Sequence, residues 1–222
     1  IEVQDGTGYI WATNSKRGNR FGQLGRRSNS RTTKQCDNEY DDIKIPQKID
    51  IPCAVAAAGG SKDSGHTLLV DKNGQVFAWG CDRWQQLGLG STKAGAAGYT
   101  WKEGKLWQYY PQIVSALSGQ VAVAVAAGAD HSVALLESGE VWTWGRGEHG
   151  QLGQQGKPFV LPPTKSDALS SGPNVGTVRS IRAEANCTGI FGGKMNSDGT
   201  RTLLKSVGRC PQEILEMWEK VH

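Results

Sequence analysis

Short apolar runs separated by turn residues recur along this chain. Residues 133–136 and 141–144 are two such runs, and Glu137-Ser138-Gly139-Glu140 joins them. Branched and large apolar side chains favour strands, and a Gly in a four-residue connection accepts the positive φ of a tight hairpin. The pattern therefore predicts a β-hairpin. Similar turn residues occur at Asp5-Gly6, Asn73-Gly74 and Asp198-Gly199, which predicts four hairpins in series.

The hairpins belong to a longer repeat. Residues 57–88 align with residues 125–153, and the same offset pairs His66 with His131, Trp79 with Trp144 and Leu87 with Leu152. A repeat of this length indicates an array of one structural unit, and these six residues are expected to be structural. We place the units at residues 1–44, 45–110, 111–176 and 177–208. The first lacks its inner strand, and the last lacks the Trp-Gly pair.

The C-terminal segment has a different periodicity. Residues 209–222 are predicted to form a short helix, because Pro211 suits a first turn and the apolar residues recur at helical spacing. These residues are Ile214, Leu215, Trp218 and Val221.

An insertion separates the second unit from the third. Residues 90–110 begin with small residues and end with five large aromatic ones: Tyr99, Trp101, Trp107, Tyr109 and Tyr110. So many aromatic side chains cannot all be solvated, so they either pack on the chain's own sheets or bind a partner. We predict partner binding for these five and for Ile214, Leu215 and Trp218, with Trp101 and Trp107 inserting into the partner.

Composition narrows the class of protein. The 222 residues include 30 Gly and 8 Trp, which fits short strands, sharp turns and little helix. A chain of this length buries roughly 70% of its unfolded surface. The net charge of +4 is too small to indicate nucleic-acid binding. No apolar run is long enough to predict a membrane span.

The cysteines and the N-terminus bear on localisation. The 5 Cys are widely spaced and odd in number, which argues against a disulfide framework and a zinc site. We therefore expect an intracellular reducing compartment, whether cytoplasm, nucleus or the interior of an organelle. Because the chain begins with Ile1, a presequence has been removed or the chain is part of a longer one.

No motif predicts catalysis or a cofactor. Residues 145–150 read G-x-G-x-x-G after a strand, but no helix follows that could hold a pyrophosphate. A nucleophile elbow is absent, and no acid recurs beside the histidines. Asn186-Cys187-Thr188 is a formal glycosylation sequon at an expected buried strand start. We predict no catalytic, cofactor-binding or metal-binding residue, and no enzymatic activity.

Three linked segments resemble the regulator of chromosome condensation repeat. They are A-A-G-x-x-H-S-x-A-L at 126–135, the G-x-V-W-x-W-G of 139–145 and G-Q-L-G at 150–153. The family repeat is a unit of a seven-bladed β-propeller. The resemblance implies an all-β propeller, or a partial one because the chain is too short for seven blades, followed by the short helix. Inside such a repeat, His66 and His131 are expected to bridge backbone groups of neighbouring blades.

The resemblance also implies function. Propellers of this family mostly recognise proteins, so we expect a non-enzymatic interaction scaffold that serves as an accessory or assembly subunit of a larger complex. The alternative is guanine-nucleotide exchange on a small GTPase, as in the founding member, although no matching loop wedge is present. A light-sensing propeller ranks third, because its arginine-flanked Gly-Trp-Arg motifs are absent.

Overall fold

The computed structural model describes residues 2–4, 6–10, 47–61, 64–90, 99–102, 105–193 and 201–220. Most of the described chain is β-strand, with one 3-10 turn, η1 (Ser115–Leu117), and one C-terminal helix, α1 (Gln212–Lys220). The all-β prediction and the terminal helix are therefore confirmed. The strands are β1 (Glu2–Gln4), β2 (Thr7–Ile10), β3 (Gln47–Ser61), β4 (Ser64–Asp71), β5 (Val76–Cys81), β6 (Tyr99–Lys102), β7 (Lys105–Ile113), β8 (Ala122–Ala127), β9 (His131–Leu136), β10 (Val141–Arg146), β11 (Phe159–Lys165), β12 (Val178–Glu184), β13 (Asn186–Gly192) and β14 (Thr202–Arg209).

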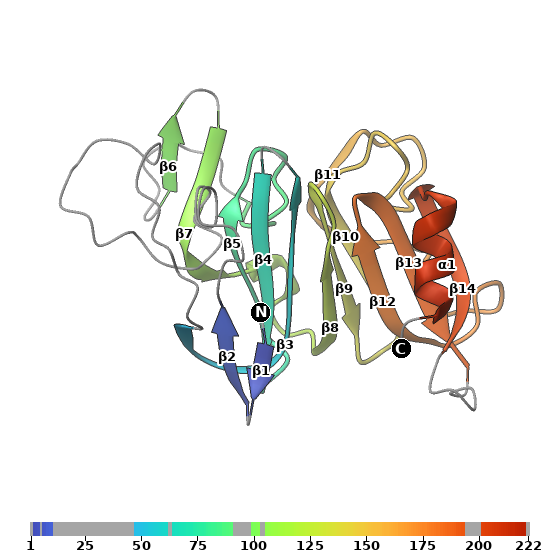
Figure 1. Ribbon diagram of the computed structural model, residues 1–222, viewed down its shortest axis with the longest axis horizontal. Helices are drawn as coiled ribbons and strands as arrows, with labels where there is room; N and C mark the ends of the chain where they lie inside the picture. Colours follow the sequence, from blue (N-terminus) through green and yellow to red (C-terminus); the bar gives the residue numbers. More distant parts are fainter. Residues whose placement is uncertain are drawn as a thin grey trace.

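The strands form four antiparallel blades that stand side by side as an arc of a propeller (Figure 1). Blade I contains β1, β2 and residues 47–52 of β3. Blade II contains residues 53–61 of β3 together with β4, β5, β7 and β6. Blade III is the sheet β8-β9-β10-β11, and blade IV is the sheet β12-β13-β14. Because β3 passes from blade I into blade II, the two blades share one continuous strand.

The predicted hairpin turns are present where the structure describes them. Gly6, Gly74 and Gly139 have φ values of 72, 80 and 84°, which side chains with a Cβ seldom adopt. The fourth turn, Asp198-Gly199, lies outside the described residues.

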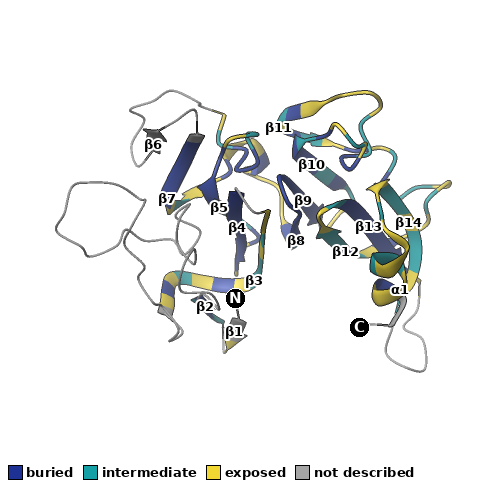
Figure 2. Cartoon of the chain, turned by 45° about the horizontal axis from the view of Figure 1, so that its top comes forward, coloured by how far each residue is buried: buried dark blue, intermediate teal, exposed yellow. Residues whose placement is uncertain are grey.

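A separate apolar core fills each space between neighbouring blades. Successive side chains of a strand point to opposite faces, so each central strand supplies two cores. On β9, Ala134 and Leu136 pack toward blade II, whereas Val133 and Leu135 pack toward blade IV. The central strands are accordingly the most buried parts of the blades (Figure 2). Burial on both faces joins the blades into one stack.

The inner strands β3, β8 and β12 lie around a cavity of about 470 Å³. Small residues line it: Ala58, Gly59, Gly60, Ala127, Gly128, Ala183 and Ala185, with Glu184. Small side chains are required here because the blades converge. A methyl group on Gly59 of blade II, for example, would overlap the carbonyl oxygen of Gly128 in blade III.

The expected boundary between residues 110 and 111 falls inside β7. Residues 112 and 113 of β7 pair with β5, so they complete blade II rather than begin blade III. Blade II thus ends at Ile113 and blade III begins at β8, after η1, which sequence periodicity alone does not reveal.

Candidate functional site

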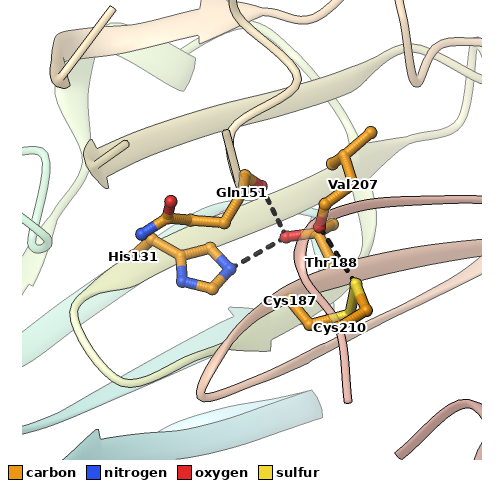
Figure 3. The surroundings of a disulfide bond; sticks show 6 residues. All are labelled: His131, Gln151, Cys187, Thr188, Val207 and Cys210. Atoms are coloured by element: carbon orange, nitrogen blue, oxygen red, sulfur yellow. Dashed lines mark hydrogen bonds between the residues drawn. A yellow bond between two sulfur atoms is a disulfide. The ribbon is translucent and has the colours of Figure 1, made fainter. Parts of the chain in front are cut away.

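The repeated histidines bridge neighbouring blades. The Nε2 atom of His66 in blade II lies 2.9 Å from Oγ of Ser132 in blade III. The Nε2 atom of His131 in blade III lies 2.8 Å from Oγ1 of Thr188 in blade IV (Figure 3). The same contact thus joins two successive pairs of blades.

Each bridging hydroxyl also reaches the backbone of the preceding blade. Ser132 Oγ donates to the carbonyl oxygen of Gln86 at 2.6 Å, and Thr188 Oγ1 donates to that of Gln151 at 2.7 Å. A hydroxyl has one proton, so its oxygen must accept from His66 or His131, and both imidazoles carry their proton on Nε2. The expected bridge to backbone groups therefore passes through a hydroxyl. No role for either hydroxyl was predicted from the sequence.

Burial makes these histidines poor acids and bases. Both side chains are fully buried, and burial lowers the pKa of His66 to about 4 and that of His131 to about 3. Among the described side chains, neither Nδ1 atom has a hydrogen-bond partner, so a second proton would leave a buried N–H unpaired. The arrangement is suited to holding blades together.

We expect this burial to make stability fall in mild acid. The pKa of an unfolded histidine is about 6.5. Between that pH and the folded pKa values of about 4 and about 3, the unfolded chain binds protons that the folded chain does not. The free energy of unfolding should therefore be unaffected by these groups above pH about 6.5 and decrease steadily below it. Urea denaturation at a series of pH values measures the decrease.

The double variant His66→Gln/His131→Gln should lose most of this pH dependence. His149→Gln is the matched control, because the His149 side chain is only partly buried. An equally steep decrease in the double variant would contradict the prediction.

The cysteines differ from expectation. Cys187 and Cys210 form a disulfide, with Cα atoms 4.8 Å apart (Figure 3). The sequence argued against a disulfide framework and gave no reason to expect this single bond, because pairing depends on the register of β13 with β14 and not on an even number of cysteines. Cys53 and Cys81 are free and buried, and burial raises the pKa of both thiols. The premise for a reducing compartment is correspondingly weaker.

The aromatic insertion builds a hairpin on the rim of blade II. Strand β6 pairs with β7, which pairs in turn with β5, so blade II extends beyond its fourth strand (Figure 1). Trp107 and Tyr109 are 5% and 8% exposed, and the Trp107 indole donates to the Tyr109 hydroxyl at 2.7 Å. Their burial argues against the predicted insertion of Trp107 into a partner. The side chains of Tyr99 and Trp101 lie outside the described residues.

Two residues of β7 remain available to a partner. Tyr110 and Ile113 are each 45% exposed. Sequence reasoning missed Ile113 because it assigned residues 111–114 to the next unit. Its apolar character on a strand that also carries the aromatic residues is the signal that could have identified it.

The terminal helix packs on its own chain. Trp218 is 3% exposed, and its ring meets Phe191 edge-on with 5.9 Å between centroids. Ile214 and Leu215 pack partly buried against the same cluster. Trp218 is therefore covered by blade IV and does not lie free for a partner. Val221 lies outside the described residues.

Metal-ligand clusters and membrane-length helices are both absent from the described residues. Within them, no three His, Cys, Asp or Glu side chains are grouped closely enough to hold an ion. The part of the chain that the structure describes also has no helix of the length and apolarity that a bilayer span needs.

Comparison of the sequence identifies a known repeat. The regulator of chromosome condensation (RCC1) repeat matches residues 73–135 and 138–183, and a second description of it matches residues 122–151. The mitochondrial RCC1 domain-containing protein RUG3 of Arabidopsis thaliana is 32% identical over 136 residues, which are 60% of this chain and 27% of that protein. Human RCC1 domain-containing protein 1 is 41% identical over 87 residues, or 39% of this chain and 20% of that protein. The chain thus spans only about a quarter of these relatives.

Solved structures share the arrangement of strands. Prp20p from Saccharomyces cerevisiae superposes with a TM-score of 0.60 at 18% identity, covering 90% of this chain and 40% of that one. Human WBSCR16 superposes with a TM-score of 0.57 at 20% identity, covering 83% and 40%. At such identities the likeness concerns the fold alone.

Proposed function

Because this chain belongs to the regulator of chromosome condensation repeat family, we propose that it is a non-enzymatic protein-interaction scaffold, an accessory or assembly subunit of a larger complex. The β6–β7 hairpin is the observation that carries the proposal. Blade III ends at its fourth strand, whereas blade II adds β6 beyond β7. The added strand leaves the repeat intact, so it serves something other than the fold of the blade.

The exposed residues of β7 give this surface its chemistry. Tyr110 and Ile113 lie on a strand that is held in place by two buried residues, Trp107 and Tyr109. An aromatic and a branched aliphatic side chain on a rigid strand are the kind of anchor that concentrates binding energy in protein interfaces. We therefore assign the partner surface to the rim of blade II, where Tyr110 and Ile113 follow the residues of β7 that pair with β6, and Tyr99 and Trp101 of β6 remain predicted members of it.

The buried histidines and their hydroxyl partners also support a non-enzymatic role. The histidines and the hydroxyls that they contact are buried between blades, where no substrate reaches them. Each hydroxyl already donates its proton to a backbone carbonyl. An active nucleophile needs that proton to pass to a base, so these pairs are unsuited to nucleophilic catalysis.

The experiment compares two double variants of the full chain. The partner is first identified by cross-linking mass spectrometry of the native complex. Tyr110→Ala/Ile113→Ala should weaken its affinity at least about 10-fold, as expected for two interface anchors, and leave the thermal midpoint unchanged. Val121→Ala/Val123→Ala is the matched control, because these side chains are 46% and 44% exposed but lie at the inner edge of blade III.

Two results would contradict the proposal. One is an equal loss of affinity in the control variant, which would place the interface elsewhere. The other is accelerated nucleotide release from a small GTPase by the purified chain, which would favour guanine-nucleotide exchange. Prp20p has been studied for its binding to Gsp1p and histones, but its 18% identity carries no residue of such an interface to this chain.

A further inference from the structure

The face of blade IV that points away from blade III is equivalent to the faces through which blades II and III contact the blades that follow them. Strand pairing shows this, because Gly80 lies opposite His66, Gly145 opposite His131 and Gly208 opposite Cys187. The three glycines have φ values of 106, 95 and 98°, so the three positions are equivalent in backbone conformation as well.

Cys187 therefore occupies the position of the bridging histidine. In blades II and III, that histidine reaches a hydroxyl of the following blade. In blade IV, the cysteine bonds instead to Cys210, which lies between the end of β14 and the start of α1. The inter-blade bridge is thus replaced by a covalent bond to the chain that leads into the helix.

The helix occupies the place of a following blade. Gly189 and Phe191 point to the same side of β13 as Cys187, and Trp218 of α1 covers them. A methyl group on Gly189 would overlap the Trp218 ring, so the glycine makes room for the indole. Figure 1 shows α1 lying against the end of the arc, on the side of blade IV away from blade III.

Apart from the disulfide, α1 is held to blade IV by Trp218 and by the partly buried Ile214 and Leu215. Among the α1 residues whose side chains the structure describes, only Trp218 is buried, and Met217 is 40% exposed. Cys210 is partly exposed, whereas Cys187 is fully buried, so a reductant can reach the Cys210 sulfur first.

We propose that the Cys187–Cys210 disulfide is a redox latch that holds α1 over the blade-binding face of blade IV. A dithiol reductant supplies the two electrons: one of its thiolates attacks Sγ of Cys210, and Cys187 leaves as a thiolate that takes up a proton. The second thiol of the reductant then displaces Cys210 and forms the reductant's own disulfide. The chain gains two thiols, and α1 loosens and uncovers Gly189 and Phe191.

Hydrogen exchange of the full chain, with and without dithiothreitol, tests this proposal. After reduction, confirmed by a mass increase of about two hydrogen atoms, exchange of the α1 amides should accelerate at least about 10-fold, as expected for local opening. Exchange in β8, β9 and β10 should not change. Cys210→Ser should show the accelerated exchange without reductant and no further response to it.

Cys81→Ser is the control, because Cys81 is buried and free and its variant should keep the full response to dithiothreitol. Unchanged exchange in α1 after reduction would overturn the latch. So would joint unfolding of β13 and β14 with α1, because the disulfide would then stabilise the blade itself. If Cys210→Ser does not fold, reduction of the native chain still decides between these outcomes.

Discussion

Trp144→Ala should lower the free energy of unfolding by about 3 to 5 kcal/mol, which is the range for removing a fully buried large aromatic side chain. Trp144 is fully buried in the core between blades II and III. Its indole nitrogen also donates to the carbonyl oxygen of Gln86 at 2.8 Å, beside the hydrogen bond from Ser132. The substitution therefore removes apolar contact and a bond between blades at one point. Urea denaturation measures the change.

Two further variants separate these contributions. Trp144→Phe keeps most of the apolar contact but loses the donor, and should cost about 1 kcal/mol plus a small packing loss. Trp142→Ala is the matched control, since Trp142 lies two residues away, is only partly buried and bonds to Glu140 at 3.1 Å. Trp142 packs against the same core but is partly exposed, so an equal loss in Trp142→Ala would contradict the prediction that full burial makes Trp144 the more important residue.

Gly145→Ala should cost about 2 to 5 kcal/mol, from about 1 to 2 for the left-handed backbone and about 1 to 3 for overpacking. Gly145 has a φ of 95°, and an added Cβ would lie 2.7 Å from the carbonyl oxygen of Asp130. The Asp130 carbonyl is held by a hydrogen bond from the Arg146 N–H at 3.0 Å, so it cannot move aside as a flexible side chain can. The thermal midpoint and the urea midpoint should both decrease.

Gly150→Ala isolates the backbone contribution. Gly150 has a φ of 79°, but nothing lies within 4 Å of an added Cβ. It should therefore cost only about 1 to 2 kcal/mol. Equal losses of stability in Gly145→Ala and Gly150→Ala would mean that the close approach to Asp130 contributes nothing to the free energy of unfolding.

The repeat could be recognised in the sequence because each unit has the same local structural requirements. A central strand needs apolar side chains on both faces, its turn needs a glycine, and the core on either side needs a large side chain at a constant position. His66 and His131 recur together with Trp79 and Trp144 for this reason. Such requirements are local, so the identity of the unit and the all-β fold follow from the order of residues.

The hydrogen-bond partners of the two histidines could not be predicted from the sequence in the same way. The sequence placed the histidines between blades but could not show that Ser132 and Thr188 intervene before the backbone. These contacts join residues 66 and 57 positions apart, and their existence depends on how far one blade is rotated against the next.

The sequence and the tertiary structure each determined part of the candidate interaction surface. The sequence identified the insertion as the segment that departs from the repeat. Tertiary structure divided its aromatic residues, because strand pairing with β5 turned Trp107 and Tyr109 inward and left Tyr110 outside. In a strand at the rim of a blade, which face is buried depends on the neighbouring elements and not on the side chains alone.

The sequence by itself determined the repeating unit, its hairpins, its glycine turns and the terminal helix, since each rests on residues near one another in the chain. Only the tertiary structure decided which elements meet: that β7 completes blade II, that Cys187 joins Cys210, and that α1 covers blade IV. Those contacts depend on strand register, and a shift of one residue would exchange the two faces of a strand and with them every partner across the interface.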